Sequence, residues 1–133
     1  MYLLACLLSV FEDKAKSEAF SPLTRRIIDY LHTHMKEKIT LEDISRITFF
    51  SPVYCDSVFK RDMGRSIIDY LLHERIKEAK KSLLEGSLSL PAVASSVGFY
   101  DYNYFVRVFK KRTGYTPTAY RKMIFAGIQY ETE

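Results

Sequence analysis

The chain has 133 residues, of which 47% are hydrophobic and 27% charged, and its formal net charge at pH 7 is +4. These values are typical of a globular chain that forms one domain or two small lobes. Two cysteines exclude a disulfide framework and a structural zinc site, and the apolar run over residues 2–11 is too short to span a membrane. We therefore expect a cytoplasmic protein that does not bind a membrane.

After residue 20 the apolar residues recur at helical spacing. An apolar stripe predicts a first helix over about residues 23–36, and its members are Ile27, Ile28, Leu31 and Met35. Residues 40–43 have the pattern of a capping box and predict the start of a short second helix. Ser51 and Pro52 supply a cap and a first residue for the third helix, because Pro has no N–H to lose there.

The third helix has two distinct faces. Its buried residues are expected to be Cys55, Val58 and Phe59. Its outward residues are expected to be Val53, Asp56, Ser57 and Lys60. A long helix over residues 66–85 follows, and its twenty or so residues correspond to roughly 30 Å of length.

The second half of the chain shows the same order of signals. A Ser cap with Pro in the first turn begins a short helix, a Gly ends it with an expected positive φ, and an Asp caps the next helix. These residues are Ser89, Pro91, Gly98 and Asp101. Thr116 and Pro117 begin a last short helix that we expect to end at about Arg121.

The two halves are copies of one pattern. Pairs that differ by 50 positions are Tyr54/Tyr104, Val58/Val108, Phe59/Phe109, Lys60/Lys110 and Gly64/Gly114. Upstream, Ile44/Val93 and Phe50/Phe99 differ by 49, so the second copy has one extra residue in the turn between its helices. Since turns tolerate insertions that packed faces do not, the repeat indicates a duplicated helix-turn-helix in an all-α fold.

Basic residues are concentrated in the second half of the chain. Residues 60–122 contain thirteen Lys and Arg against six Asp and Glu, whereas residues 1–59 contain seven against eight. A positive field of this kind favours a polyanion such as DNA. A solvated basic face without a partner fits the charge alone equally well.

Together these segments resemble the DNA-binding domain of AraC/XylS-type bacterial transcription regulators. The matching residues are 40–44, 51–54, 59–60, 97–99, 104–111, 114–117 and 120–121. The resemblance implies about seven helices in two helix-turn-helix lobes, with one recognition helix per lobe in successive major-groove segments of promoter DNA. The expected boundaries are 21–64 for the first lobe, 65–86 for the linker helix, 87–124 for the second lobe and 125–133 for a C-terminal tail.

Residues 1–20 are expected to form an N-terminal helical extension, because Leu4, Leu7, Leu8 and Phe11 recur at helical spacing. Regulators of this type commonly carry a ligand-binding or receiver domain ahead of the DNA-binding module. The resemblance therefore implies an upstream sensor domain or a homodimer in the full-length protein, and RNA polymerase as a partner of an activator.

The second recognition helix has the better side chains for reading bases. Asn103 and Arg107 lie four residues apart on its outward face, and Tyr102 lies beside them. Arg suits the O6 and N7 atoms of guanine, and Asn suits N6 and N7 of adenine. Candidate phosphate contacts in the whole chain are Ser51, Lys60, Arg61, Lys110, Lys111, Arg112, Thr116 and Arg121.

The first recognition helix presents Val53, Asp56 and Ser57, where related regulators often have a long polar or basic side chain. Asp56 has two interpretations: it accepts a hydrogen bond from cytosine N4, or, as we favour, it stabilises the N-terminal turn of its own helix. We expect this lobe to contribute positioning and apolar contacts. Phe49 stands where the second copy has Gly98, so the two turns are expected to differ in shape.

The sequence contains no pattern typical of an enzyme, and we expect neither a cofactor nor a metal. His32, His34 and His73 are scattered without a matched ligand set, and there is no phosphate-binding glycine loop. The alternative to a sequence-specific regulator is a basic helical module that binds an acidic protein, or an architectural DNA binder without sequence readout.

Overall fold

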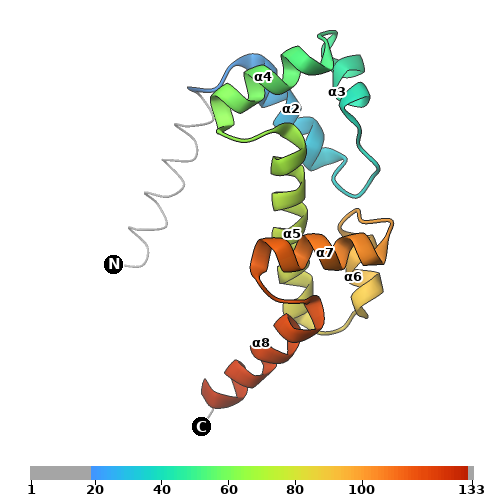
Figure 1. Ribbon diagram of the computed structural model, residues 1–133, viewed down its shortest axis with the longest axis vertical. Coiled ribbons are helices and arrows are strands. Elements are labelled where there is room, and N and C mark those ends of the chain that lie inside the picture. The colour runs from blue at the N-terminus through green and yellow to red at the C-terminus, as the bar shows by residue number, and fades with distance from the viewer. Residues whose placement is uncertain (1–18, 132–133) are drawn as a thin grey trace. The chain divides into compact units, whose positions relative to one another are not determined.

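The structure is a computed structural model that describes residues 19–131, with side chains described up to residue 127 (Figure 1). Over this range the chain forms α-helices and no strand, as the sequence predicts. The helices are α2 (Pro22–Thr33), α3 (Leu41–Thr48), α4 (Pro52–Met63), α5 (Ile67–Glu85), α6 (Leu90–Ser96), α7 (Tyr102–Thr113) and α8 (Pro117–Glu131). The helical extension expected over residues 1–20 falls almost wholly outside the described residues, and so does Cys6.

The described chain forms two compact units. The first contains residues 19–33 and 39–67, and the second contains residues 34–38 and 68–131. Helix α5 therefore starts at the last residue of the first unit and continues into the second. The boundaries expected from the sequence placed residues 34–38 in the first lobe, whereas in the structure these residues belong to the second unit.

In the first unit α2, α3 and α4 pack on one another. The residues that fill their shared core are Ile27, Leu31, Ile44, Cys55 and Phe59. The predicted capping box at the start of α3 is present, because Thr40 Oγ1 accepts from the N–H of Asp43 and Asp43 Oδ2 accepts from the N–H of Thr40. Ser51 caps α4, with Pro52 as its first residue.

Helix α2 is shorter than the sequence predicts. It ends at Thr33 instead of near residue 36, so Met35 lies in a turn and does not continue the helical stripe. The carbonyl oxygens of Met35 and Glu37 accept hydrogen bonds from the buried side chain of Arg75. The turn is thus held by a contact some forty residues away, which local periodicity does not reveal.

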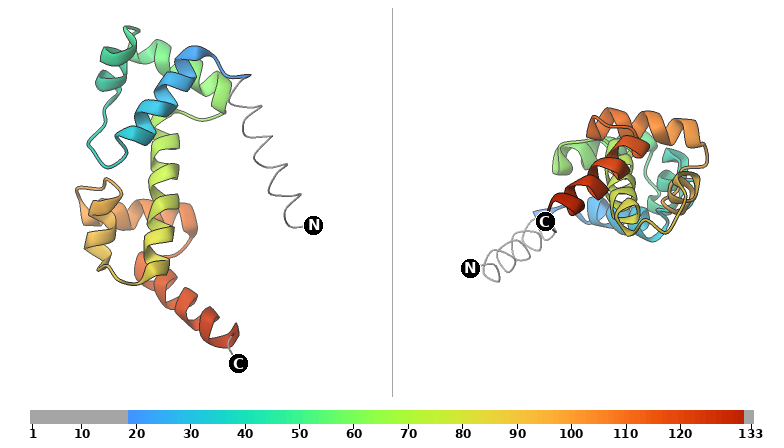
Figure 2. Two further views of the ribbon diagram at one scale, coloured as in Figure 1. Left: turned by 180° about the vertical axis from the view of Figure 1, so that it is seen from behind. Right: turned by 90° about the horizontal axis from the view of Figure 1, so that it is seen from below.

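In the second unit α7 crosses α5 and packs against α6 and α8, as Figures 1 and 2 show from several sides. The core is formed by Ile76, Ala79, Leu83, Val93, Ala94, Val97, Phe99, Phe105, Val108 and Phe109. Ser89 and Asp101 cap α6 and α7 as predicted.

The last helix is longer than expected. Instead of ending near Arg121, α8 continues to Glu131, so most of residues 125–133 are helical and not a tail. No Pro interrupts residues 118–131. The ring of Phe125 packs over the turn at Gly86, where an added Cβ would lie only 2.9 Å from the ring. Tertiary packing therefore supports the extension.

The predicted repeat is present in three dimensions. Helices α4 and α7 each have 12 residues and begin 50 positions apart. Each residue from 51 to 64 has the same degree of burial as its counterpart from 101 to 114. The connection before α7 (residues 97–101) is two residues longer than that before α4 (residues 49–51). One of the two is the predicted insertion, and the other arises because α6 ends one matched position earlier than α3.

The turns of the two copies share one backbone feature. Phe49 has a φ of 65°, and Gly98, its counterpart, has a φ of 102°. Both turns therefore use a left-handed residue at the matched position, although they differ in length. Phe49 is the one non-glycine residue with positive φ among the described residues.

Candidate nucleic-acid interface

The outward face of α7 is fixed by its cap and its core. Asp101 Oδ1 accepts hydrogen bonds from the N–H groups of Asn103 (2.9 Å) and Tyr104 (3.3 Å), which sets the start of the helix. Phe105 and Phe109 are completely buried. As a result Asn103 and Arg107 are exposed on the opposite side, one helical turn apart, as the sequence predicts.

Tyr104 supports Arg107 from the same face. The guanidinium carbon of Arg107 lies 5.7 Å from the centroid of the Tyr104 ring, and this ring lies 5.9 Å from that of Phe99. A stacked Arg is restricted in orientation, which lowers the entropy lost when its planar fork binds a base edge. Sequence reasoning did not select Tyr104, although its spacing of three residues from Arg107 was a usable signal.

Tyr102 is less available than predicted. Its side chain is partly buried against the core of the second unit, and its ring centroid lies 6.2 Å from that of Phe105. The base-reading candidates of α7 therefore differ in exposure. Asn103 and Arg107 are exposed to solvent, whereas Tyr102 is partly buried.

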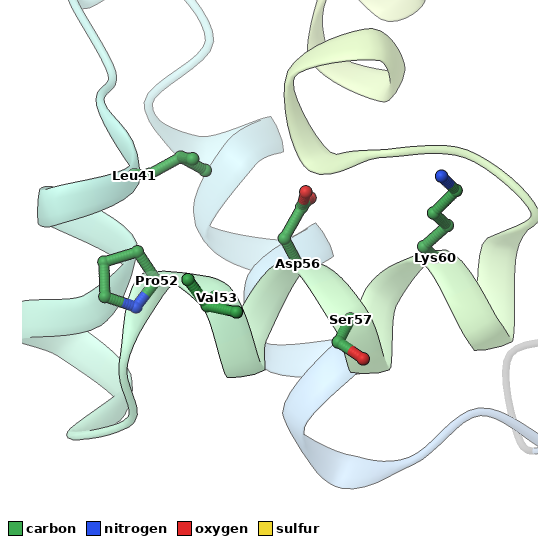
Figure 3. A pocket seen from close by; sticks show the side chains of 6 residues that line it. All are labelled: Leu41, Pro52, Val53, Asp56, Ser57 and Lys60. Atoms are coloured by element: carbon green, nitrogen blue, oxygen red, sulfur yellow. The ribbon is translucent and has the colours of Figure 1, made fainter.

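The outward face of α4 lines a shallow pocket (Figure 3). The lining residues are Leu41, Pro52, Val53, Asp56, Ser57 and Lys60. Val53 is 81% exposed. Asp56 Oδ1 accepts a hydrogen bond from the N–H of Ile67, the first residue of α5, at 2.9 Å. The carboxylate therefore stabilises the start of α5, and the interpretation that it stabilises the first turn of its own helix was wrong.

The predicted phosphate contacts fall into three groups. Lys60, Lys110 and Lys111 are exposed. Ser51 and Thr116 accept from the N–H groups of Tyr54 (3.2 Å) and Ala119 (3.1 Å), so their hydroxyls cap α4 and α8. The third group consists of three arginines that have internal partners.

Arg112 is half-buried and forms an ion pair of 2.7 Å with Asp69 of α5. Arg121 donates from Nη2 to the carbonyl oxygen of Leu88 at 2.8 Å, and its Nε is buried without a partner. Arg61 is more open and lies 3.4 Å from Asp62. The two arginines with short contacts thus help to hold the second unit together.

Asp62, near the end of α4, forms hydrogen bonds with residues at the start of α2. Its Oδ2 accepts from Thr24 Oγ1 (2.7 Å), Ser21 Oγ (2.8 Å) and the N–H of Ser21 (3.1 Å). These hydrogen bonds, that from Thr24 first, lower the pKa of Asp62 from 3.8 to about 2. The start of α2 is thereby attached to the end of the recognition helix α4.

Arg75 plays a similar part in the second unit, and sequence reasoning missed it. It is 8% exposed and donates to the carbonyl oxygens of Met35 (3.0 Å) and Glu37 (2.7 Å), with its guanidinium 5.9 Å from the Phe99 ring centroid. Burial lowers the pKa of Arg75. Buried charges of this kind fix a local geometry at a cost in desolvation.

Within residues 19–131 there is no helix with both the length and the apolar character needed to cross a lipid bilayer.

The chain is similar to several known proteins. A helix-turn-helix domain family model matches residues 44–123. The chain is 30% identical over 120 residues to the uncharacterized HTH-type transcriptional regulator YobQ of Bacillus subtilis, covering 90% of this chain and 48% of YobQ. It is 34% identical over 97 residues to the bifunctional transcriptional activator/DNA repair enzyme AdaA of the same organism, covering 73% and 46%.

Among solved structures, the C-terminal domain of AraT, a response regulator from Geobacillus stearothermophilus, superimposes with a TM-score of 0.76 at 33% identity, covering 79% of this chain and 88% of that domain. The chain spans about half the length of the two Bacillus relatives. The matched residues run from within α3 through α4, α5, α6 and α7 into the first half of α8, so they include both recognition helices and the helix between them. The chain therefore belongs to the helix-turn-helix family of AraC-type DNA-binding domains.

Proposed function

We propose that this protein is a bacterial transcription regulator that binds double-stranded promoter DNA, with α4 and α7 in successive major-groove segments. The observation that carries the proposal is the repeated, capped recognition helix whose second copy exposes Asn103 and Arg107. Asn and Arg at this spacing match the hydrogen-bonding edges of purines in the major groove. Family membership supports the same function.

Residue roles follow from exposure and partners. Asn103 and Arg107 read bases, and Tyr104 holds Arg107 in position. Lys60, Lys110 and Lys111 bind phosphates, because they are exposed at the ends of the recognition helices. Ser51 and Thr116 lie at the N-termini of α4 and α8. The N–H groups and the dipole at these helix ends favour a phosphate of the DNA backbone.

The rest of the protein's activity is inferred from its relatives. The name of AdaA describes a transcriptional activator, and AraT is a response regulator. We propose that this chain likewise activates transcription in the cytoplasm through contact with RNA polymerase, under control of an upstream sensor domain or as a homodimer. The DNA-binding module itself is proposed to have no enzymatic activity.

The test starts with selection of bound sequences from a random duplex library. On the recovered duplex, Arg107→Ala should weaken binding by about 1–3 kcal/mol and relax the preference at one base pair. Lys111→Ala should weaken binding to all sequences and reduce the slope of log affinity against log salt by about 1. Lys38→Ala removes the same charge from outside the recognition helices and should leave base preference unchanged.

Three results would contradict the proposal. Equal losses on every sequence for the Arg107 and Lys111 variants would reject the division of roles. Salt-dependent binding without any sequence preference would favour the architectural alternative, and absence of duplex binding would favour a module that binds an acidic protein.

A further inference from the structure

The start of α4 carries an exposed apolar surface. Its residues are Phe49 (89% exposed), Phe50 (48%), Val53 (81%) and Tyr54 (50%). Single exposed apolar residues are common, but four within six positions are not. At the matching place in the second unit Phe99 is buried, Gly98 has no side chain and Asn103 is polar.

The same face of α4 has few groups that can form hydrogen bonds with a base. Val53 and Ser57 occupy the positions matched by Asn103 and Arg107. Asp56 already accepts from the N–H of Ile67. In Figure 3 the Asp56 carboxylate turns towards the connection that leads into α5, while Val53 and Ser57 lie along the other side of the helix. The short hydroxyl of Ser57 is the remaining polar group near the middle of this face.

An apolar major-groove reader has one natural target. Thymine is the base that presents a methyl group there, at C5, and apolar side chains contact it. Val53 exposes two methyl groups, and Leu41 and Pro52 line the pocket beside it. We propose that the first unit selects A·T pairs through contact between Val53 and thymine methyl groups. This inference rests on the proposed function, because it requires that α4 lies in the major groove.

Deoxyuridine provides a direct test, because it differs from thymidine by this methyl group alone. In the selected duplex each thymidine is replaced by deoxyuridine in turn. A footprint on the selected duplex shows the two segments that the protein protects. The positions whose base preference changes in the Arg107→Ala variant mark the α7 segment, so the other protected segment belongs to α4. At one or more thymidines in the α4 segment, deoxyuridine should weaken binding by about four-fold, as expected for loss of one buried methyl.

Val53→Ala should weaken binding to the thymidine duplex and remove the sensitivity to deoxyuridine at the contacted position. Ser57→Ala is the matched control on the same face and should keep that sensitivity. Val53 is so exposed that its truncation should not unfold the protein, which a thermal melt will verify. The inference is overturned if the thymidine duplex binds but no deoxyuridine in the α4 segment changes the affinity. Failure to bind the thymidine duplex at all would instead overturn the proposed function.

Discussion

Gly98 meets two separate requirements at one position. Its φ is +102°, a conformation that L side chains rarely adopt, and a Cβ would overlap the carbonyl oxygen of Met35 and approach Arg75 Nε to 2.8 Å. Gly64 and Gly114 also have positive φ, +77° and +85°, but an added Cβ would meet nothing within 4 Å. Backbone strain and steric exclusion are thus separable in this chain.

We predict that Gly98→Ala lowers the free energy of unfolding by more than about 3 kcal/mol, because the Cβ has to displace a buried hydrogen-bonded arginine as well as strain the backbone. Gly114→Ala, in the same unit, should cost only about 1–2 kcal/mol. Urea unfolding followed by circular dichroism measures both values. Equal losses would show that the contact with Met35 and Arg75 contributes nothing.

Phe49 shows the limit of residue-level prediction. A Gly at position 98 signals positive φ, and the sequence predicts it, but a Phe at the matched position carries no such signal. The left-handed conformation costs a non-glycine residue on the order of 1 kcal/mol, and the 89% exposed side chain recovers little of it by packing. The two turns therefore share a left-handed backbone conformation at the matched position, although the residue there is Phe in one and Gly in the other.

Between elements, the hydrogen bonds of Asp62 connect the start of α2 with the end of α4. The folded-state pKa of Asp62 is about 2 and the unfolded value is 3.8. Its ionised carboxylate therefore contributes to the free energy of unfolding above pH 4, and this contribution is lost as the pH falls through 2. The shift corresponds to about 2 kcal/mol.

We predict that the wild type loses about 2 kcal/mol more unfolding free energy between pH 4.5 and pH 2 than Asp62→Asn does. The difference between the two proteins isolates Asp62, because Asp43, whose pKa is also lowered by its hydrogen bonds with Thr40, is common to both. Denaturant midpoints measured across this pH range provide the comparison. Parallel pH profiles would mean that Asp62 is not stabilised in the folded state.

Helix starts could be predicted because their determinants lie within a few residues. The caps Thr40, Ser51, Ser89 and Asp101 each bond to a backbone N–H no more than three positions away. The outward positions of α4 and α7 followed from the same local period. This local information predicted the helices of both helix-turn-helix units, and the resemblance to AraC/XylS-type regulators implied that α4 and α7 are the recognition helices.

Contacts between distant residues account for what the sequence did not reveal. Arg112 and Arg121 were expected to bind phosphates, but their partners Asp69 and Leu88 lie 43 and 33 positions away. Arg75 acts over a similar separation on the turn after α2. A charged side chain has the same appearance in a sequence whether it faces solvent or a buried carbonyl, so exposure had to come from the structure.

At the scale of the whole molecule, each compact unit contains one helix-turn-helix, and α5 connects them covalently. The 19 residues of α5 correspond to about 28 Å of helix, close to the roughly 34 Å of one turn of B-DNA. Since Ile67 belongs to the first unit and the rest of α5 to the second, the two units are joined without a linker between them. We therefore expect the protein to accept a limited range of spacings between the two DNA segments that it binds.

That limit leads to a prediction about the DNA. Five base pairs inserted between the two protected segments rotate one of them by about half a turn, so affinity should fall to that of a duplex in which the α4 segment is scrambled. Ten inserted base pairs return the two segments to the same side of the duplex but move them about 34 Å further apart. Because the two units are joined without a linker, affinity should not recover. Fluorescence anisotropy titrations on the four duplexes measure the effect. Unchanged affinity with five inserted base pairs would mean that the two units bind DNA independently of each other.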